Sequence, residues 1–264
     1  MMRRLKYTLG SAALEYVTRF TPLLDSPAGP PDLVNFAGAG DYTVLGDRNI
    51  RLAVADAGLS QGDHVLDIGC AIGRNALALH RRFGEAVAYD GFDIVRFGIT
   101  WCRKWARRHA PDFRFHHADL ANGFYNPRGR VNPLDYRFPR PDSSIDVSIA
   151  TSVYTHMTPD EVAHYLRETA RVTRPGGRLY ATAFLDDEGS RAARADGAAM
   201  LSFDHAIEGA RIEDPAEPTL AVLLAPSLFA DGLAEAGARQ VRFLPGSWRG
   251  APADDLQDRV IAEF

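Results

Sequence analysis

The stretch His64–Arg82 constrains the fold more strongly than any other part of this chain. It begins His-Val-Leu-Asp-Ile-Gly-Cys-Ala-Ile-Gly and continues from Arg74 with a helix-forming run. A short apolar run that leads through a glycine turn into a helix is typical of the first strand, turn and helix of an α/β sheet. Glycine lets the backbone bend sharply and lets a ligand approach without a Cβ in the way. We therefore predict an α/β fold with a ligand-binding turn at residues 69–73.

Strands and helices alternate through the rest of the chain. Apolar runs predict strands at residues 64–68, 86–92, 113–117, 145–153, 178–184, 240–244 and 258–262. Helices are predicted from a cap at Asp47 to residue 57, and at 74–82, 95–109, 159–173 (after a Thr158 capping box) and 228–237. Such alternation indicates a doubly wound, mainly parallel sheet. Ligands bind to sheets of this kind at the carboxyl ends of the strands.

Composition places the chain among ordinary globular proteins. Of its 264 residues, 46% are hydrophobic and 24% are charged, with a net charge of −4. A strongly basic surface is therefore not expected, and we predict no nucleic-acid partner. Its two cysteines, Cys70 and Cys102, cannot form a disulfide framework, which favours a reducing, cytoplasmic setting. We predict one α/β domain over residues 45–264, with an irregular insertion at about 186–217, after an N-terminal helical and linker segment at 1–44.

The N-terminal segment has an amphipathic pattern. Apolar residues recur there at helical spacing beside basic ones, namely Leu5, Leu9, Ala12, Tyr16, Phe20 and Leu23. Two interpretations are open: a helix on a membrane surface, or a terminal helix that packs on the domain, which base rates favour. No apolar run approaches the roughly 18 residues that a membrane span needs.

The glycine turn carries a more specific pattern. A dinucleotide-binding turn requires Gly-x-Gly-x-x-Gly, but Ala71 and Arg74 occupy its second and third glycine positions. The stretch Asp67-x-Gly69-x-Ala71-x-Gly73 resembles instead the first motif of class I S-adenosylmethionine-dependent methyltransferases, an acidic residue followed by alternating glycines. Ala71 departs from that motif at its middle glycine. The resemblance implies that these residues bind S-adenosylmethionine.

Further stretches resemble the same family in the same order. Asp93 ends the second strand, where the family places a carboxylate that binds both ribose hydroxyls; a helix cap is the alternative role. Asp119 and Leu120 follow the third strand and resemble the adenine-binding position. Residues 141–147 and 167–179 resemble the lead into the fourth strand and the helix–turn–strand after it. The resemblance covers about 45–185, with a weaker echo at 257–262, and implies a type 11/25-like small-molecule methyltransferase whose sheet has seven strands, the last antiparallel.

Candidate acceptor residues follow the third and fourth strands. His156 titrates near neutrality and is the candidate general base for a hydroxyl acceptor; a structural hydrogen-bonding role is the alternative. Tyr154 is a candidate wall residue. The long loop after the third strand brings Tyr125 and Arg128 towards the predicted cleft, where arginine suits an anionic or sugar-bearing acceptor; a solvated surface loop is the alternative. No cluster of histidine, aspartate or glutamate has metal-ligand spacing, so we predict no metal.

Three functions remain open. The motif series favours a methyltransferase that acts on a small molecule, most simply at the oxygen of a sugar, lipid-linked or secondary-metabolite hydroxyl. The chain has no Asn-Pro-Pro-Tyr or Asp-Pro-Pro-Tyr motif of the kind that suggests methylation of bases or amide nitrogens. The alternative is a non-catalytic subunit or regulator that binds S-adenosylmethionine, because Ala71 departs from the motif. A nicotinamide-dependent dehydrogenase is disfavoured by Arg74.

Overall fold

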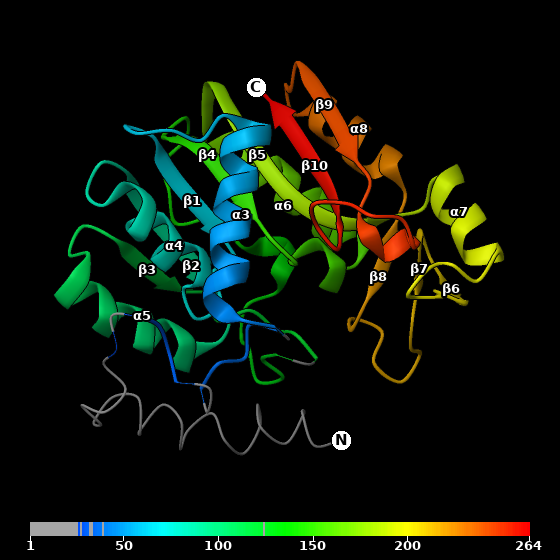
Figure 1. The fold of residues 1–264 in the computed structure, drawn as a ribbon, viewed down its shortest axis with the longest axis horizontal. Helices are drawn as coiled ribbons and strands as arrows, with labels where there is room; N and C mark the ends of the chain where they lie inside the picture. The colour runs from blue at the N-terminus through cyan, green and yellow to red at the C-terminus, as the bar shows by residue number, and fades with distance from the viewer. Residues whose placement is uncertain (1–25, 27, 32–33, 39, 124) are drawn as a thin grey trace. The chain divides into compact units, whose positions relative to one another are not determined.

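A computed structural model describes residues 26, 28–31, 34–38, 40–123 and 125–264 (Figure 1). The chain divides into two compact units, residues 1–139 and 140–264. The seven predicted strands are all present, three in the first unit and four in the second. The chain is therefore a mixed α/β protein, as predicted.

The first unit contains a parallel sheet with β2 at its centre. Its elements are α3 (Tyr42–Ala57), β1 (His64–Ile68), α4 (Arg74–Phe83), β2 (Ala88–Asp93), α5 (Arg96–His109), β3 (Arg114–His117) and the short helix η2 (Pro133–Asp135). Helix α5 packs on β2 and β3, and α3 packs on α4 (Figure 1). In the pairing of the strands, Ile68 lies opposite Phe92, and Asp93 opposite His117. The carboxyl ends of all three strands thus meet at one edge, where a ligand is expected.

Helix α3 begins earlier than predicted. Its N-cap is Asp41, whose side chain accepts the backbone N–H of Val44 at 2.8 Å, and Gly58 ends it in the left-handed conformation. The predicted cap at Asp47 is wrong, because Asp47 lies inside the helix and pairs with Arg81 at 2.7 Å. Both aspartates precede apolar positions of the same helix, so the residue pattern alone did not separate them.

The second unit contains the antiparallel last strand. Its main elements are β4 (Ile145–Ala150), η3 (Tyr154–His156), α6 (Pro159–Val172), β5 (Thr173–Leu185), α8 (Pro226–Glu235), β9 (Gln240–Leu244), η4 (Ser247–Arg249) and β10 (Asp258–Glu263). Strand β4 runs parallel to β5, and β10 lies antiparallel between β5 and β9. The Thr158 capping box that starts α6 is present, with Pro159 in the first turn. The predicted antiparallel end of the sheet is thus confirmed.

Residues 186–217 are more regular than their sequence suggests. They contain α7 (Glu188–Ala195) and a hairpin of β6 (His205–Ile207) and β7 (Ala210–Ile212). The hairpin pairs with β8 (Val222–Leu224), which also runs parallel to the end of β5 (Figure 1). A cluster of three aromatic side chains lies in the same unit, formed by Phe184, Phe203 and Trp248. These strands are only three residues long, so their pattern is too short to be read as strand from sequence.

None of the helices in the described part of the chain is both long and apolar enough to cross a bilayer. The predicted N-terminal helix lies outside the described residues.

Candidate cofactor and acceptor sites

The turn between β1 and α4 has the backbone shape that glycine favours. The φ angles of Gly69, Ala71 and Gly73 are 68°, 51° and 80°, all in the left-handed region. Ala71 therefore adopts the conformation of the glycine that it replaces, at a cost of roughly 1 kcal/mol. A Cβ on Gly73 would lie 3.0 Å from Cys102 Sγ, so helix α5 packs directly against the turn. The departure at Ala71 changes the side chain and leaves the shape of the turn intact.

Substituting Gly73 tests how tightly this turn is packed. We expect Gly73→Ala to lower the free energy of unfolding by about 2–3 kcal/mol, since left-handed strain of about 1–2 kcal/mol adds to the contact with Cys102. Gly62→Ala is the matched control: Gly62 has a φ of 88°, and a Cβ added there would have no atom of the described chain within 4 Å. Urea unfolding of both variants measures the difference. Equal losses would show that the turn is not closely packed.

Asp67 is fully buried and both of its carboxylate oxygens have protein partners. Tyr89 donates its hydroxyl to Oδ2 at 2.9 Å, and Asn75 Nδ2 donates to Oδ1 at 3.2 Å. Asn49 Nδ2 in turn donates to Asn75 Oδ1 at 3.0 Å. Burial raises the pKa of Asp67 to about 7, although the two donors oppose the shift. Asp67 thus links β1 to β2 and α4, and no motif in the sequence marks its partners Tyr89 and Asn75, or Asn49, which donates to Asn75.

Asp93 joins the end of β2 to the glycine turn. Its Oδ2 accepts the backbone N–H of Ala71 at 2.9 Å, and its Oδ1 accepts that of Val95 at 2.7 Å. Burial raises the pKa of Asp93 to about 6, against the effect of these backbone donors. Asp93 is 8% exposed, and the backbone N–H of Ile94 is a third donor to its carboxylate, whose two oxygens have about four acceptor positions between them. The N-cap of α5 is Val95, which has no side-chain cap bond, so Asp93 accepts from the N–H of the cap residue and is not itself the cap.

Residues ahead of the predicted domain boundary contribute to the same turn. Tyr42 donates its hydroxyl to the carbonyl of Ile72 at 2.9 Å. The ring of Phe36 packs edge-on against Phe97 of α5, with ring centroids 5.0 Å apart. Tyr42 and Phe36 themselves lie within the segment predicted as helix and linker, where no motif marks them.

Asp119 follows β3 and binds the loop that comes after it. Arg130 Nε donates to Oδ2 at 2.6 Å, and Asn126 Nδ2 donates to Oδ1 at 3.2 Å. Leu120 is buried, and its carbonyl accepts a second bond from Asn126 Nδ2 at 2.9 Å. Of the predicted acceptor residues in this loop, Tyr125 is half-buried and Arg128 is exposed. The loop is thus folded back on the end of β3.

In the second unit, His156 is held by a backbone carbonyl. Its Nδ1 lies 2.9 Å from the carbonyl oxygen of Thr219, which can only accept, so Nδ1 carries the proton. Burial lowers the pKa of His156, although backbone hydrogen bonds to Thr219 and Leu220 oppose the shift, so the ring is neutral at pH 7. Tyr154 is fully buried and packs against Phe229 in the core of this unit. The geometry of His156 is compatible with both predicted roles, a base and a structural hydrogen-bond donor.

A polar cluster that sequence reasoning missed lies at the carboxyl end of β4. Ser152 has a left-handed φ of 56°, and its backbone N–H donates to Thr182 Oγ1 at 2.8 Å. Thr182 Oγ1 donates to Gln257 Oε1 at 2.6 Å, and Ser152 Oγ lies 3.0 Å from the same oxygen. With Oε1 engaged by both hydroxyls, the carboxamide of Gln257 presents Nε2 as its donor. Gln257 directly precedes β10, and this position was the only signal in the sequence.

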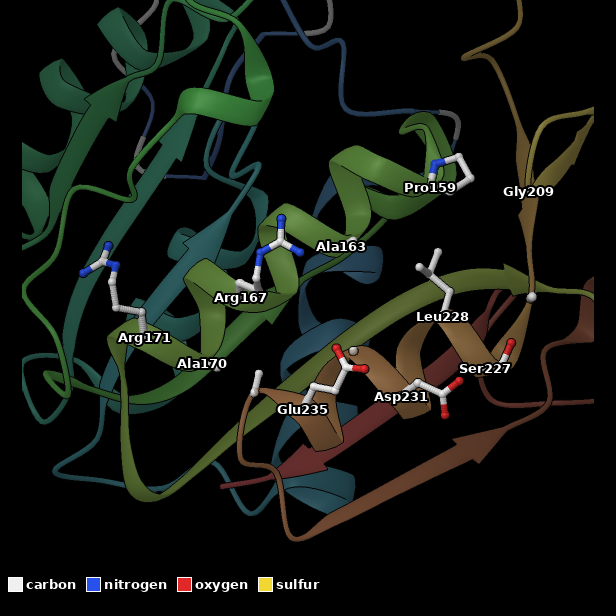
Figure 2. A pocket seen from close by; sticks show the side chains of 13 residues that line it. Pro159, Ala163, Arg167, Ala170, Arg171, Gly209, Ser227, Leu228, Asp231 and Glu235 are labelled. Atoms are coloured by element: carbon white, nitrogen blue, oxygen red, sulfur yellow. The ribbon is translucent and has the colours of Figure 1, made fainter.

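The second unit also has a pocket of about 830 Å³ between α6 and α8. Figure 2 shows Arg167 on α6 and Asp231 and Glu235 on α8 among its lining side chains. None of the predicted site residues lines it. Separately, no three histidine, cysteine, aspartate or glutamate side chains of the described residues gather as metal ligands.

Comparison with known proteins identifies the domain. Residues 65–177, which include the glycine turn, Asp93 and Asp119, match the model of a methyltransferase domain family. The chain contains a class I S-adenosylmethionine-dependent methyltransferase domain. The match ends at Gly177, within β5, so the domain model leaves the insertion and the last strands undescribed.

Relatives of this methyltransferase domain match only part of their own length. The 27-O-demethylrifamycin SV methyltransferase of Amycolatopsis mediterranei (strain S699) is 37% identical over 148 residues, which cover 55% of this chain and 48% of that protein. The chain spans about half the length of the curated relatives it matches. These relatives are named methyltransferases, which does not favour the alternative of a non-catalytic subunit.

Solved structures share the methyltransferase fold at low sequence identity. The PH0226 protein from Pyrococcus horikoshii OT3 superposes with a TM-score of 0.56 and 14% identity, over 94% of this chain and 98% of that one. The [4+2]-cyclase SpnF superposes with a TM-score of 0.53 and 20% identity, over 89% of this chain and 76% of that one. Because one of these proteins is named a cyclase, the fold alone does not decide the reaction.

Proposed function

We propose that the chain is a methyltransferase that transfers the methyl group of S-adenosylmethionine to a hydroxyl oxygen of a small secondary metabolite. The observation that carries the proposal is the hydrogen bond from the backbone N–H of Ala71 to the Asp93 carboxylate. It joins a turn with left-handed φ angles to a carboxylate at the end of β2. The match to a methyltransferase that acts on 27-O-demethylrifamycin SV supports the acceptor class.

The residues of the first unit have the chemistry that this cofactor needs. The left-handed turn at Gly69, Ala71 and Gly73 would let the cofactor approach the backbone closely, because its two glycines have no side chains. Asp93 would accept from the ribose hydroxyls through the acceptor capacity that its three backbone donors leave, and Asp119 would accept from the adenine amine, beside the backbone of Leu120. Asp67 would hold the turn in place through its hydrogen bonds with Tyr89 and Asn75, without touching the cofactor.

The acceptor residues are assigned from the chemistry of their side chains. When bound, S-adenosylmethionine supplies an electrophilic methyl group on a sulfonium. His156 Nε2 would take the proton of the acceptor hydroxyl, and Gln257 Nε2 would donate a hydrogen bond to a neighbouring oxygen of the acceptor. Tyr125, which is half-buried, would contact the acceptor from the loop after β3. Because Tyr154 is buried among core residues, its role would be to support the segment that carries His156.

The affinity for the product S-adenosylhomocysteine should depend on pH. The pKa of Asp93 is raised to about 6, so this carboxyl is protonated below that pH in the free protein and ionised above it. A carboxylate accepts from the ribose hydroxyls more strongly than a carboxylic acid does. We therefore expect the dissociation constant to rise by up to about tenfold for each pH unit below 6 and to be flat above it. Calorimetry from pH 4.5 to 8 measures the profile, and a constant affinity across pH 6 would remove Asp93 from the contact.

Methyl transfer to a defined acceptor tests the reaction. The protein is incubated with S-adenosylmethionine labelled in its methyl group and with a panel of hydroxyl-bearing secondary metabolites that includes 27-O-demethylrifamycin SV. We expect label in at least one product that carries a new O-methyl group, and none in the corresponding O-methylated compound used as the matched control. Labelling of RNA alone, or no transfer by protein that binds S-adenosylhomocysteine, would contradict the proposal.

A further inference from the structure

The loop residues 121–123 and 125–131 fold against the end of β3. The carbonyl of Asp119 accepts the backbone N–H groups of both Arg130 (2.9 Å) and Val131 (3.0 Å), and Ala121 N–H donates to the carbonyl of Val131 at 2.9 Å. A Cβ on Gly129 would lie 2.0 Å from the carbonyl oxygen of Leu120, so only glycine permits this approach. The loop backbone is therefore fixed against the two residues predicted to meet adenine.

Two side chains of this loop hold the carboxylate of Asp119 from different directions. Arg130 Nε donates to Oδ2 at 2.6 Å, while Asn126 Nδ2 donates to Oδ1 at 3.2 Å and to the carbonyl of Leu120 at 2.9 Å. The Arg130 guanidinium and the other donors lower the pKa of Asp119, which keeps its carboxyl ionised. Each oxygen can accept one further bond, since a carboxylate oxygen has two lone pairs. The side chain is thus charged, oriented and still able to accept.

We propose that Arg130 and Asn126 are positioning residues for base recognition: by fixing the Asp119 carboxylate, they make the site prefer adenine, which presents an amine, over a base that presents a carbonyl oxygen. The inference rests on the proposed function, in which Asp119 meets the adenine end of the cofactor. A fixed carboxylate accepts from an exocyclic amine and repels a carbonyl oxygen at the same place. A carboxylate that is free to rotate distinguishes the two less, because it can turn away from the repulsive oxygen.

The loop offers a matched control for this role. The side chain of Arg130 is 82% exposed, so its replacement leaves no buried cavity. Arg128, two residues earlier, is also exposed and makes no hydrogen bond or ion pair with the described residues. Arg130→Gln and Arg128→Gln therefore remove the same charge from the same loop, but only the first removes a bond to Asp119.

The experiment compares two ligands that differ along one edge of the base, because hypoxanthine has a carbonyl oxygen in place of the amine and also carries a proton on N1. Calorimetry gives the dissociation constants of S-adenosylhomocysteine and S-inosylhomocysteine, which carries a carbonyl oxygen in place of the amine. It is run on the wild-type chain and on Asp119→Asn, Arg130→Gln, Arg130→Lys, Asn126→Ala and Arg128→Gln. We expect the wild type to prefer the adenine ligand by about 30-fold or more, the range of a charged hydrogen bond. Arg130→Gln and Asn126→Ala should reduce that preference at least about fivefold, Arg130→Lys should restore part of it, and Arg128→Gln should leave it unchanged.

Each result bears on a different claim. If Arg130→Gln and Asn126→Ala weaken both ligands equally, the two residues serve only the fold of the loop, and the proposal is overturned. A preference that survives Asp119→Asn would overturn it as well, by showing that Asp119 does not read the base, while leaving cofactor binding itself intact. If neither ligand binds to folded wild-type protein, the proposed function fails along with the inference.

Discussion

Replacing Asp258 by alanine should lower the free energy of unfolding by about 3–5 kcal/mol, the range for breaking a buried ion pair. Asp258 is fully buried at the start of β10 and accepts four hydrogen bonds. They come from the backbone N–H groups of Leu185 (2.8 Å) and Gly246 (2.7 Å), from Trp248 Nε1 (2.9 Å) and from Arg249 Nε (2.8 Å). The substitution leaves all four donors in the interior without this acceptor.

The effect should extend to the insertion. Arg249, which is 10% exposed, also binds both oxygens of Asp187, the N-cap of α7, at 2.7 and 2.8 Å. We expect hydrogen exchange in α7 to speed up in the variant, because its anchor is loosened. The matched control is Asp254→Ala, since Asp254 is 61% exposed and lies 3.5 Å from Arg259; it should cost less than about 1 kcal/mol. Similar losses for the two variants in urea unfolding would refute the assigned role of Asp258.

Replacing His156 by asparagine should reduce kcat by about 100-fold or more, the contribution of a positioned general base. Asparagine can donate its Nδ2–H to the carbonyl of Thr219 as histidine does through Nδ1, but it has no basic nitrogen at the position of Nε2. The variant therefore preserves the structural bond and removes the base. Methyl transfer to the acceptor identified above measures kcat.

The structural alternative predicts a different pattern. If His156 only holds the segment near Thr219, His156→Asn keeps its activity while His156→Ala loses thermal stability. A base also predicts the pH profile of the wild type. Because burial lowers the pKa of His156, activity should stay constant at neutral pH and fall only at pH values below the usual pKa of histidine. Affinity for S-adenosylhomocysteine should be unchanged in both variants. An active His156→Asn enzyme would remove His156 from the chemistry.

The parts of the fold that depend on local pattern could be predicted from the sequence. The limits of β1 and the glycine turn follow from an apolar run bounded by glycine, and the start of α6 follows from the Thr158 capping box. The antiparallel β10 came from the family resemblance. Asp93 was placed at the end of β2 by the same reasoning, and the structure puts its carboxylate on the turn.

The rest depends on contacts between distant residues. Asp41 caps α3 in place of Asp47, and Tyr42 in the first turn of the helix donates to the carbonyl of Ile72 in the glycine turn, a contact that no local pattern records. The cluster of Ser152, Thr182 and Gln257 joins residues up to 105 positions apart. Asp119 was expected to face a ligand, and the structure adds two loop donors, one on each of its oxygens. Such partners become visible only when the strands are paired and the loops are closed.

Calorimetric titration of the purified chain with S-adenosylhomocysteine, with NAD as the comparison ligand, tests the central claim most directly. We predict binding of S-adenosylhomocysteine at one site per chain, no binding of NAD, and an affinity at least about tenfold lower in Asp93→Ala, which loses a charged acceptor. Circular dichroism shows whether that variant is folded. Binding of NAD alone, or no binding of S-adenosylhomocysteine to folded wild-type protein at pH 7.5, would contradict the account.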